Sequence, residues 1–147
     1  MLLVKMSVVN PSARLGALRV VPIFRGLARS TLLKVASRTR EVAHPAGATI
    51  VREGDPGDVL CIITEGTVQV RRQGIVVAEM TAGDFFGEIS LIDGGPRSAT
   101  VVAVDDVVLL TLSSSDYQAL LNIPYVARAA LRSLAGRLRE ANSLDDL

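Results

Sequence analysis

The chain has 147 residues, of which 49% are hydrophobic, and a formal net charge of +1. This length suits one folded domain with its own core. A single cysteine, Cys61, excludes an internal disulfide, which favours a reducing, cytoplasmic location. A single histidine, His44, leaves too few soft ligands for a typical metal site. No apolar run reaches the length of a membrane span. These counts disfavour metalloenzymes, thiol redox proteins and histidine-dependent hydrolases.

The small net charge conceals an uneven distribution. Residues 1–40 hold eight basic side chains and no acidic one, whereas residues 41–127 hold twelve acidic and four basic side chains. The basic part is interpreted as solvated helix faces, with a surface for an acidic partner or nucleic acid as the alternative. Any anion site in the acidic middle must be built from local groups, because the surrounding field opposes it.

The first 39 residues carry helical signals. The pattern predicts a short amphipathic helix over Ala13–Val20, a break at Pro22 and a second helix capped by Ser30. From about Arg40 the hydrophobic period changes from 3.6 to 2, which indicates strands.

Six short runs rich in valine, isoleucine and threonine follow, separated by glycine- and aspartate-containing turns. Many short strands at this spacing favour an antiparallel barrel or a double-sheet roll. The predicted strands are Thr49–Arg52, Val59–Thr64, Thr67–Arg72, Ile75–Met80, Thr100–Val104 and Val107–Leu112.

Two helices are predicted after the strands. Ser114 or Ser115 is expected to cap the first, which runs through Leu121. Pro124 is expected to begin the second, which runs to about Ser143.

The segment 85–101 interrupts the strand pattern. One apolar turn, from Ile89 to Ile92, lies between Gly87 and a Gly-Gly-Pro bend. A short helix that begins after a glycine exposes unpaired backbone N–H groups, which suit an anion. Arg97 follows the bend, and its planar guanidinium matches two phosphate oxygens. Ser98 can add a hydroxyl donor.

Glu88 does not fit a site for a bare anion, because its carboxylate would repel a phosphate. The conflict disappears if Glu88 accepts a hydrogen bond from a hydroxyl on the same ligand. The pair Glu88 and Arg97 therefore indicates a nucleotide whose phosphate is held close to its ribose.

These residues resemble a known family. Segments 86–91 (FGEISL) and 96–101 (PRSATV) resemble the phosphate-binding cassette of the cyclic nucleotide-binding domain family, which includes catabolite activators, protein kinase A regulatory subunits and cyclic nucleotide-gated channels. Further likeness lies at 22–27, 50–58, 62–68 and 131–138.

The resemblance implies an α+β fold. We expect an eight-stranded antiparallel β-roll, jelly-roll-like, flanked by N-terminal helices, a short phosphate-binding helix and two C-terminal helices. Residues 1–147 would form a single domain, with a helical segment at 1–39, the roll at 40–113, the cassette at 85–101 and hinge and lid helices at 114–143.

The resemblance also implies residue roles. Glu88 would hold the ribose 2′-hydroxyl and Arg97 the exocyclic phosphate oxygens. Ser98, where a threonine would favour cGMP, favours cAMP as the ligand, and no other cofactor or metal is expected. The implied contact set is Phe86, Gly87, Glu88, Ile89, Ser90, Arg97, Ser98 and Ala99 for phosphate and ribose, with Arg137, Asn142 and Ser143 toward the base.

The leading hypothesis is a regulatory sensor, not an enzyme, in which a cyclic nucleotide changes the arrangement of the helices and so controls a partner or effector domain. The alternatives are the ligand-binding part of a catabolite-activator-type transcription regulator and a ligand-free interaction domain. Nucleic acid is not expected to bind this chain alone. An apolar stripe on the last helix packs on the roll or forms a homodimer; it consists of Ala127, Leu131, Leu134 and Leu138.

Overall fold

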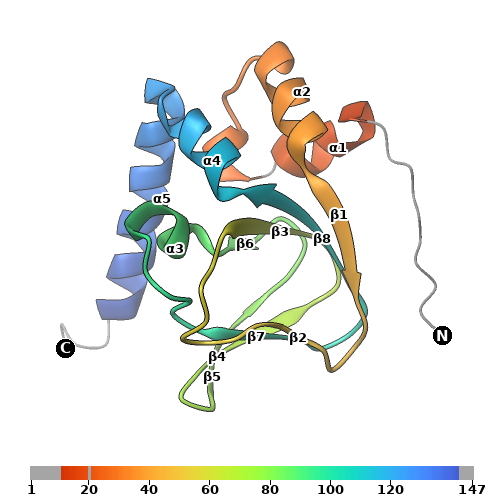
Figure 1. Ribbon diagram of the computed structural model, residues 1–147, viewed down its shortest axis with the longest axis vertical. Coiled ribbons are helices and arrows are strands. Elements are labelled where there is room, and N and C mark those ends of the chain that lie inside the picture. The colour runs from red at the N-terminus through yellow and green to blue at the C-terminus, as the bar shows by residue number, and fades with distance from the viewer. Residues whose placement is uncertain (1–10, 20, 143–147) are drawn as a thin grey trace.

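Helices from both ends of the chain gather on one side of a set of strands (Figure 1). The computed structural model describes residues 11–19 and 21–142. Three helical elements come first: α1 (Pro11–Arg19), the 3₁₀ helix η1 (Pro22–Phe24) and α2 (Arg29–Arg38). Two come last: α4 (Ser114–Leu121) and α5 (Pro124–Asn142).

Eight strands within the described residues form two antiparallel sheets of four. The first sheet has the order β1-β8-β3-β6 and the second β2-β7-β4-β5. The short helix α3 (Glu88–Asp93) separates β6 from β7. The strands are β1 (Arg40–His44), β2 (Thr49–Val51), β3 (Val59–Glu65), β4 (Val68–Arg72), β5 (Ile75–Met80), β6 (Phe85–Phe86), β7 (Thr100–Ala103) and β8 (Val107–Ser113).

Strand β3 is buried on both faces because it separates two hydrophobic cores. Its side chains alternate, so Cys61 and Ile63 point into the roll, whereas Leu60 and Ile62 point toward the helices. Strand β8 alternates in the same way, with Val107 and Leu109 in the roll and Leu110 and Leu112 in the helical core. This two-sided burial explains why both strands read as nearly continuous apolar runs.

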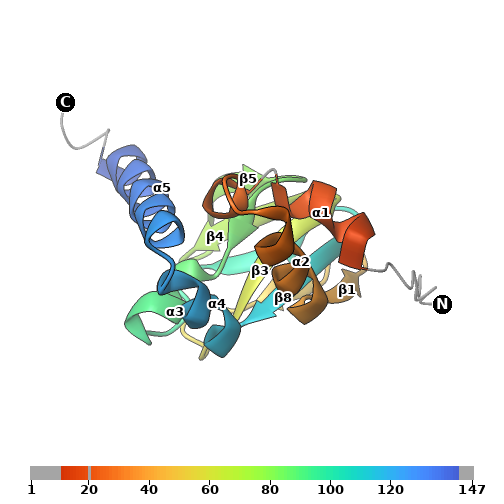
Figure 2. The same ribbon diagram turned by 90° about the horizontal axis from the view of Figure 1, so that it is seen from above.

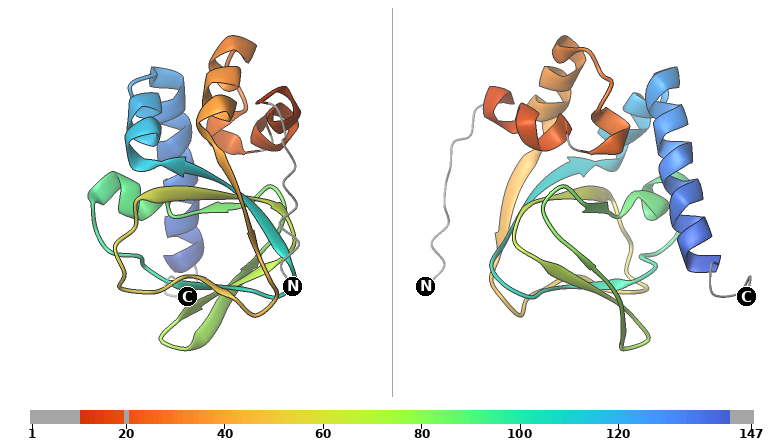
Figure 3. Two further views of the ribbon diagram at one scale, coloured as in Figure 1. Left: turned by 45° about the vertical axis from the view of Figure 1, so that its right-hand side comes forward. Right: turned by 180° about the vertical axis from the view of Figure 1, so that it is seen from behind.

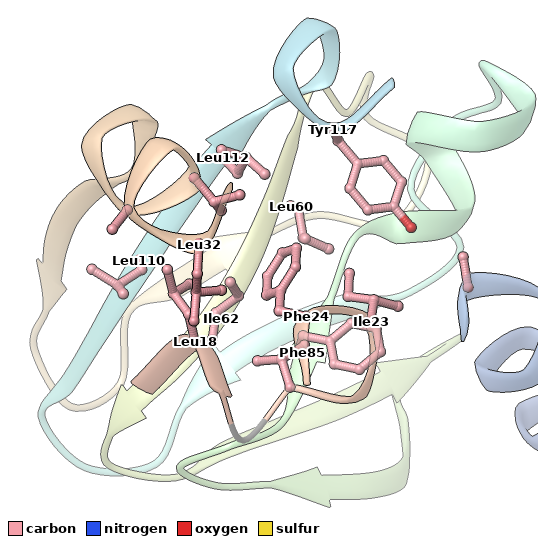
Figure 4. Close-up of a cluster of buried hydrophobic side chains, with 14 of the residues drawn as sticks. Leu18, Ile23, Phe24, Leu32, Leu60, Ile62, Phe85, Leu110, Leu112 and Tyr117 are labelled. Atoms are coloured by element: carbon pink, nitrogen blue, oxygen red, sulfur yellow. The ribbon is translucent and has the colours of Figure 1, made fainter. Parts of the chain in front are cut away.

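The helical core lies on the outer face of the first sheet (Figures 1 and 4). Phe24, Leu32 and Tyr117 are fully buried there. Seen from above, α1, α2 and α4 lie over β3 and β8, while α5 extends beyond the roll (Figure 2). No helix among the described residues is long and apolar enough to cross a membrane.

The predicted α+β fold and its six strands are confirmed, and β1 and β6 complete the eight. Both predicted serine caps are wrong. Helix α2 begins at Arg29 because Leu32 N already donates to Ala28 O at 2.9 Å, which places Ser30 inside the first turn. Helix α4 is capped by Ser113, whose Oγ accepts from Asp116 N at 3.2 Å.

The other helix boundaries shift slightly. Helix α1 begins at Pro11, two residues before the prediction, in keeping with the preference of proline for the first helical turn. Val20, its predicted end, lies outside the described residues, as does Ser143. Pro124 begins α5 as predicted.

Candidate functional site

A cavity of about 710 Å³ opens between the second sheet, the cassette and α5. Most of the predicted contact residues line it: Phe86, Gly87, Glu88, Ser90, Arg97, Ser98, Ala99 and Arg137. Of the others, Ile89 lies in α3 and Asn142 is the last residue of α5. Ser143 lies outside the described residues.

Arg97 is held in place by both its backbone and its side chain. The loop between β2 and β3 pairs with it, since Arg97 N donates to Asp55 O at 2.8 Å and Gly54 N donates to Arg97 O at 2.9 Å. Its guanidinium donates to Gly87 O at 3.2 Å and to Val59 O at 2.9 Å. A guanidinium has five N–H donors, so these two bonds leave donors for a phosphate.

Two glycines make room for this guanidinium. Gly87 precedes α3 with a φ of 95°, in the left-handed region that glycine tolerates best. A Cβ there would overlap the Arg97 guanidinium and would lie 2.7 Å from Val59 O. A Cβ at Gly57 would also overlap the Arg97 side chain. Sequence reasoning included Gly57 only within the family-like segment 50–58 and missed this role, because the contact joins segments that are distant in the chain.

Glu88 is the first residue of α3 and is only 1% exposed. Arg137, from α5, forms an ion pair with it. Burial raises the pKa of the Glu88 carboxyl to about 7, although the nearby Arg137 charge opposes that rise. Removal of the carboxyl from water therefore outweighs the attraction of the Arg137 charge in setting the direction of this shift.

Arg137 also fixes α5 against the cassette. Its Nη2 donates to Phe85 O at 2.6 Å, and its guanidinium lies 4.5 Å from the centre of the Phe85 ring. Helix α5 consequently runs beside α3 at the edge of the roll (Figures 1 and 3). A contact of Arg137 with the base stays a prediction; in this structure Arg137 contacts Glu88 and Phe85.

Of the remaining predicted residues, some are buried and support the cassette, and one lies at the surface of the cavity. Ser90 Oγ donates to Pro96 O at 3.2 Å and so fastens α3 to the bend before Arg97. Phe86 and Ala99 belong to the core of the roll. Ser98 is exposed and lines the cavity.

Sequence reasoning missed the far wall of the cavity. This wall is mostly apolar, with Arg72 and Glu140 among its residues. In the sequence these residues show only the alternation of strands and the apolar stripe of the last helix, and both patterns indicate ordinary packing. The apolar members are Val51, Val70, Val77, Ala78, Met80, Val101, Leu134 and Leu138.

Known proteins resemble this chain in sequence and in fold. The family model for the cyclic nucleotide-binding domain matches residues 41–123. The chain belongs to the cyclic nucleotide-binding domain family. The matched region contains the roll, the cassette and α4, and it ends just before α5.

Three relatives illustrate the family's range. A cyclic nucleotide-gated potassium channel of Mesorhizobium japonicum is 45% identical over 100 residues, which are 68% of this chain and 28% of the channel. The cyclic AMP receptor protein of Thermus thermophilus is 39% identical, over 86% of this chain and 61% of the receptor. The regulatory domain of Toxoplasma gondii protein kinase A, co-crystallised with cAMP, has a TM-score of 0.76 and 29% identity, over 86% of this chain and 50% of that one. This cyclic nucleotide-binding domain thus spans less than two thirds of each of these proteins.

The position of Gly87 gives a first prediction. Gly87→Ala and Gly47→Ala both place a side chain at positive φ, but the new Cβ has open space only at Gly47. Each should lower the free energy of unfolding by about 1–2 kcal/mol. In urea unfolding, Gly87→Ala should lower the free energy of unfolding more than Gly47→Ala does, because the new Cβ forces the Arg97 guanidinium to move. Equal losses for the two variants would show that the guanidinium does not need the glycine.

The carboxyl of Glu88 gives a second prediction. Its pKa rises from 4.5 to about 7 on folding, so the folded state binds the proton more tightly. Stability should therefore fall as pH rises between those values. Relative to Glu88→Gln, the free energy of unfolding should drop by roughly 2–3 kcal/mol more between pH 5 and pH 8. The other titratable groups are present in both proteins, so their effects on stability cancel in the difference. If the free energy of unfolding changes with pH equally in the two proteins, the raised pKa of Glu88 is contradicted.

Proposed function

We propose that this chain is a cyclic nucleotide sensor that binds cAMP without catalysing a reaction. One observation carries the proposal: Arg97 and Glu88 line the same cavity without pairing with each other. Arg97 donates to two backbone carbonyls, and Glu88 pairs with Arg137. A ligand with a phosphate joined to its own ribose brings an anion to Arg97 and the N-terminus of α3, and a hydroxyl to Glu88. Micromolar binding needs about 8 kcal/mol, to which charge-assisted hydrogen bonds contribute about 1.5–3 kcal/mol each.

The base is assigned to the apolar wall. Val70 and Met80 on the second sheet and Leu134 on α5 line the same cavity as the phosphate cassette. A planar base placed between them removes apolar surface from water on both faces. Ser98 and the names of the Thermus and Toxoplasma relatives favour cAMP over cGMP.

Helix α5 is proposed as the element that responds to the ligand. In this structure Arg137 pairs with Glu88, the residue assigned to the ribose hydroxyl. A ligand that engages Glu88 weakens the ion pair between Glu88 and Arg137. It thereby shifts the equilibrium between positions of α5. A partner or an effector domain that contacts α5 would receive the signal.

A second candidate is the ligand-binding part of a catabolite-activator-type transcription regulator. The 39% identity to the Thermus receptor over 86% of this chain favours it. Both candidates need the same nucleotide site and differ only in the effector.

Self-association is assigned to the same helix. Leu131 and Leu138 are 67% and 62% exposed and stand one heptad apart on α5. We propose that a second copy of the chain covers this stripe, because a heptad spacing suits a like helix.

The nucleotide site is tested by binding. Thermal unfolding should shift upward with cAMP and not with AMP. In titration calorimetry, Arg97→Ala should weaken cAMP binding by roughly thirty- to a thousand-fold, and Arg97→Lys should recover only part of this, because lysine lacks the planar fork.

The control for this series is Arg40→Ala, which removes an exposed arginine outside the cavity. It should bind cAMP like the unaltered chain. A loss below threefold for Arg97→Ala would remove Arg97 from the site. The absence of a shift with any cyclic nucleotide would leave the ligand-free interaction domain.

The α5 dimer is tested by sedimentation equilibrium. The unaltered chain should show a monomer–dimer equilibrium, and Leu131→Glu should be monomeric because the carboxylate would be buried at the contact. Arg132→Glu, at a neighbouring exposed position, should still dimerise. A chain that stays monomeric at high concentration would contradict this assignment.

A further inference from the structure

A tyrosine hydroxyl is buried next to the candidate site without a hydrogen-bond partner. Tyr117 lies on α4 and is fully buried, and among the described residues its Oη has no donor or acceptor within reach. Buried tyrosine hydroxyls ordinarily find a partner, so an orphan of this kind calls for an explanation. Glu88 Oε1 is also buried, and its partner is the Arg137 guanidinium.

The two side chains belong to helices that touch. Gln118, the neighbour of Tyr117 on α4, donates to Leu91 O of α3 at 3.3 Å. The Tyr117 hydroxyl points toward α3, the light green helix (Figure 4). Burial raises the pKa of Tyr117 to about 12, and the charge of Glu88 adds to that rise.

The present partner of Glu88 comes from the helix proposed to move. When a bound nucleotide engages Glu88 and weakens its pair with Arg137, the Glu88 carboxylate stays inside the protein, where an ionised group needs donors. The ribose hydroxyl of a bound nucleotide supplies one donor. The unused hydroxyl of Tyr117 can supply a second from α4, on the side of α3 that faces the helical core.

We infer that Tyr117 is a positioning residue for the nucleotide: its hydroxyl donates to the Glu88 carboxylate in the nucleotide-bound protein and aims that carboxylate at the ribose 2′-hydroxyl. This inference rests on the proposed function. It gives α4 a polar contact with the ribose subsite, in addition to the apolar packing that Tyr117 shares with Leu91.

The experiment is Tyr117→Phe, which removes only the oxygen, with cAMP and 2′-deoxy-cAMP as paired ligands in titration calorimetry. Affinity for cAMP should fall about three- to tenfold, while affinity for the 2′-deoxy analogue should stay within about twofold. In a Glu88→Gln background, Tyr117→Phe should cause no further loss. Tyr125→Phe, which removes a hydroxyl from a 49% exposed tyrosine, is the matched control and should change neither affinity.

Three results would overturn the inference. Equal weakening of both ligands would assign Tyr117 a packing role, and unchanged cAMP affinity would show that the hydroxyl does not act on Glu88. A marked loss of stability of free Tyr117→Phe in urea would show that the hydroxyl already has a partner without ligand. Binding by the unaltered chain distinguishes these three results from failure of the proposed function. If the unaltered chain binds no cyclic nucleotide, the sensor assignment is wrong and the inference falls with it.

Discussion

The cavity depends on the way one guanidinium is packed against backbone. Arg97 lies between Gly57 and Gly87, and its N–H groups bind two main-chain carbonyls, of Gly87 and Val59. Because these partners are backbone atoms, the cation is fixed without consuming a carboxylate. Its positive charge remains available inside a roll whose sequence is otherwise acidic.

Glu88 is held in the opposite manner. Its partner is a side chain from α5, and its burial makes the ionised form costly, as the raised pKa shows. The cation of the site is thus fixed by the roll, and the carboxylate is the group whose partner belongs to the last helix. In the sensor proposed above, the backbone contacts of Arg97 would stay in place, and the Arg137–Glu88 pair would be the contact that changes on binding.

The sequence allowed the cassette to be predicted, because its signals are local: a glycine before one apolar turn, a bend and an arginine after it. The strands were predictable for the same reason, since alternation operates within a few residues. The prediction named Ser114 and Ser115 as caps, and Ser113 is the same residue type, so only the pairing of β8, which extends to Ser113, explains why Ser113 is the cap. The Arg137 contacts could not be predicted at all, because Arg137 and Phe85 are 52 residues apart and meet only when α5 docks.

The two residues of β6 belong to different hydrophobic cores. Phe85 belongs to the core beneath the helices and lies under Arg137, whereas Phe86 belongs to the core of the roll and lines the cavity. Their side chains leave the backbone in opposite directions, so this short strand contributes one aromatic ring to each core. One peptide bond therefore separates the wall of the cavity from the core beneath the helices, and in the sensor proposed above a shift at Phe86 would reach that core at the adjacent residue.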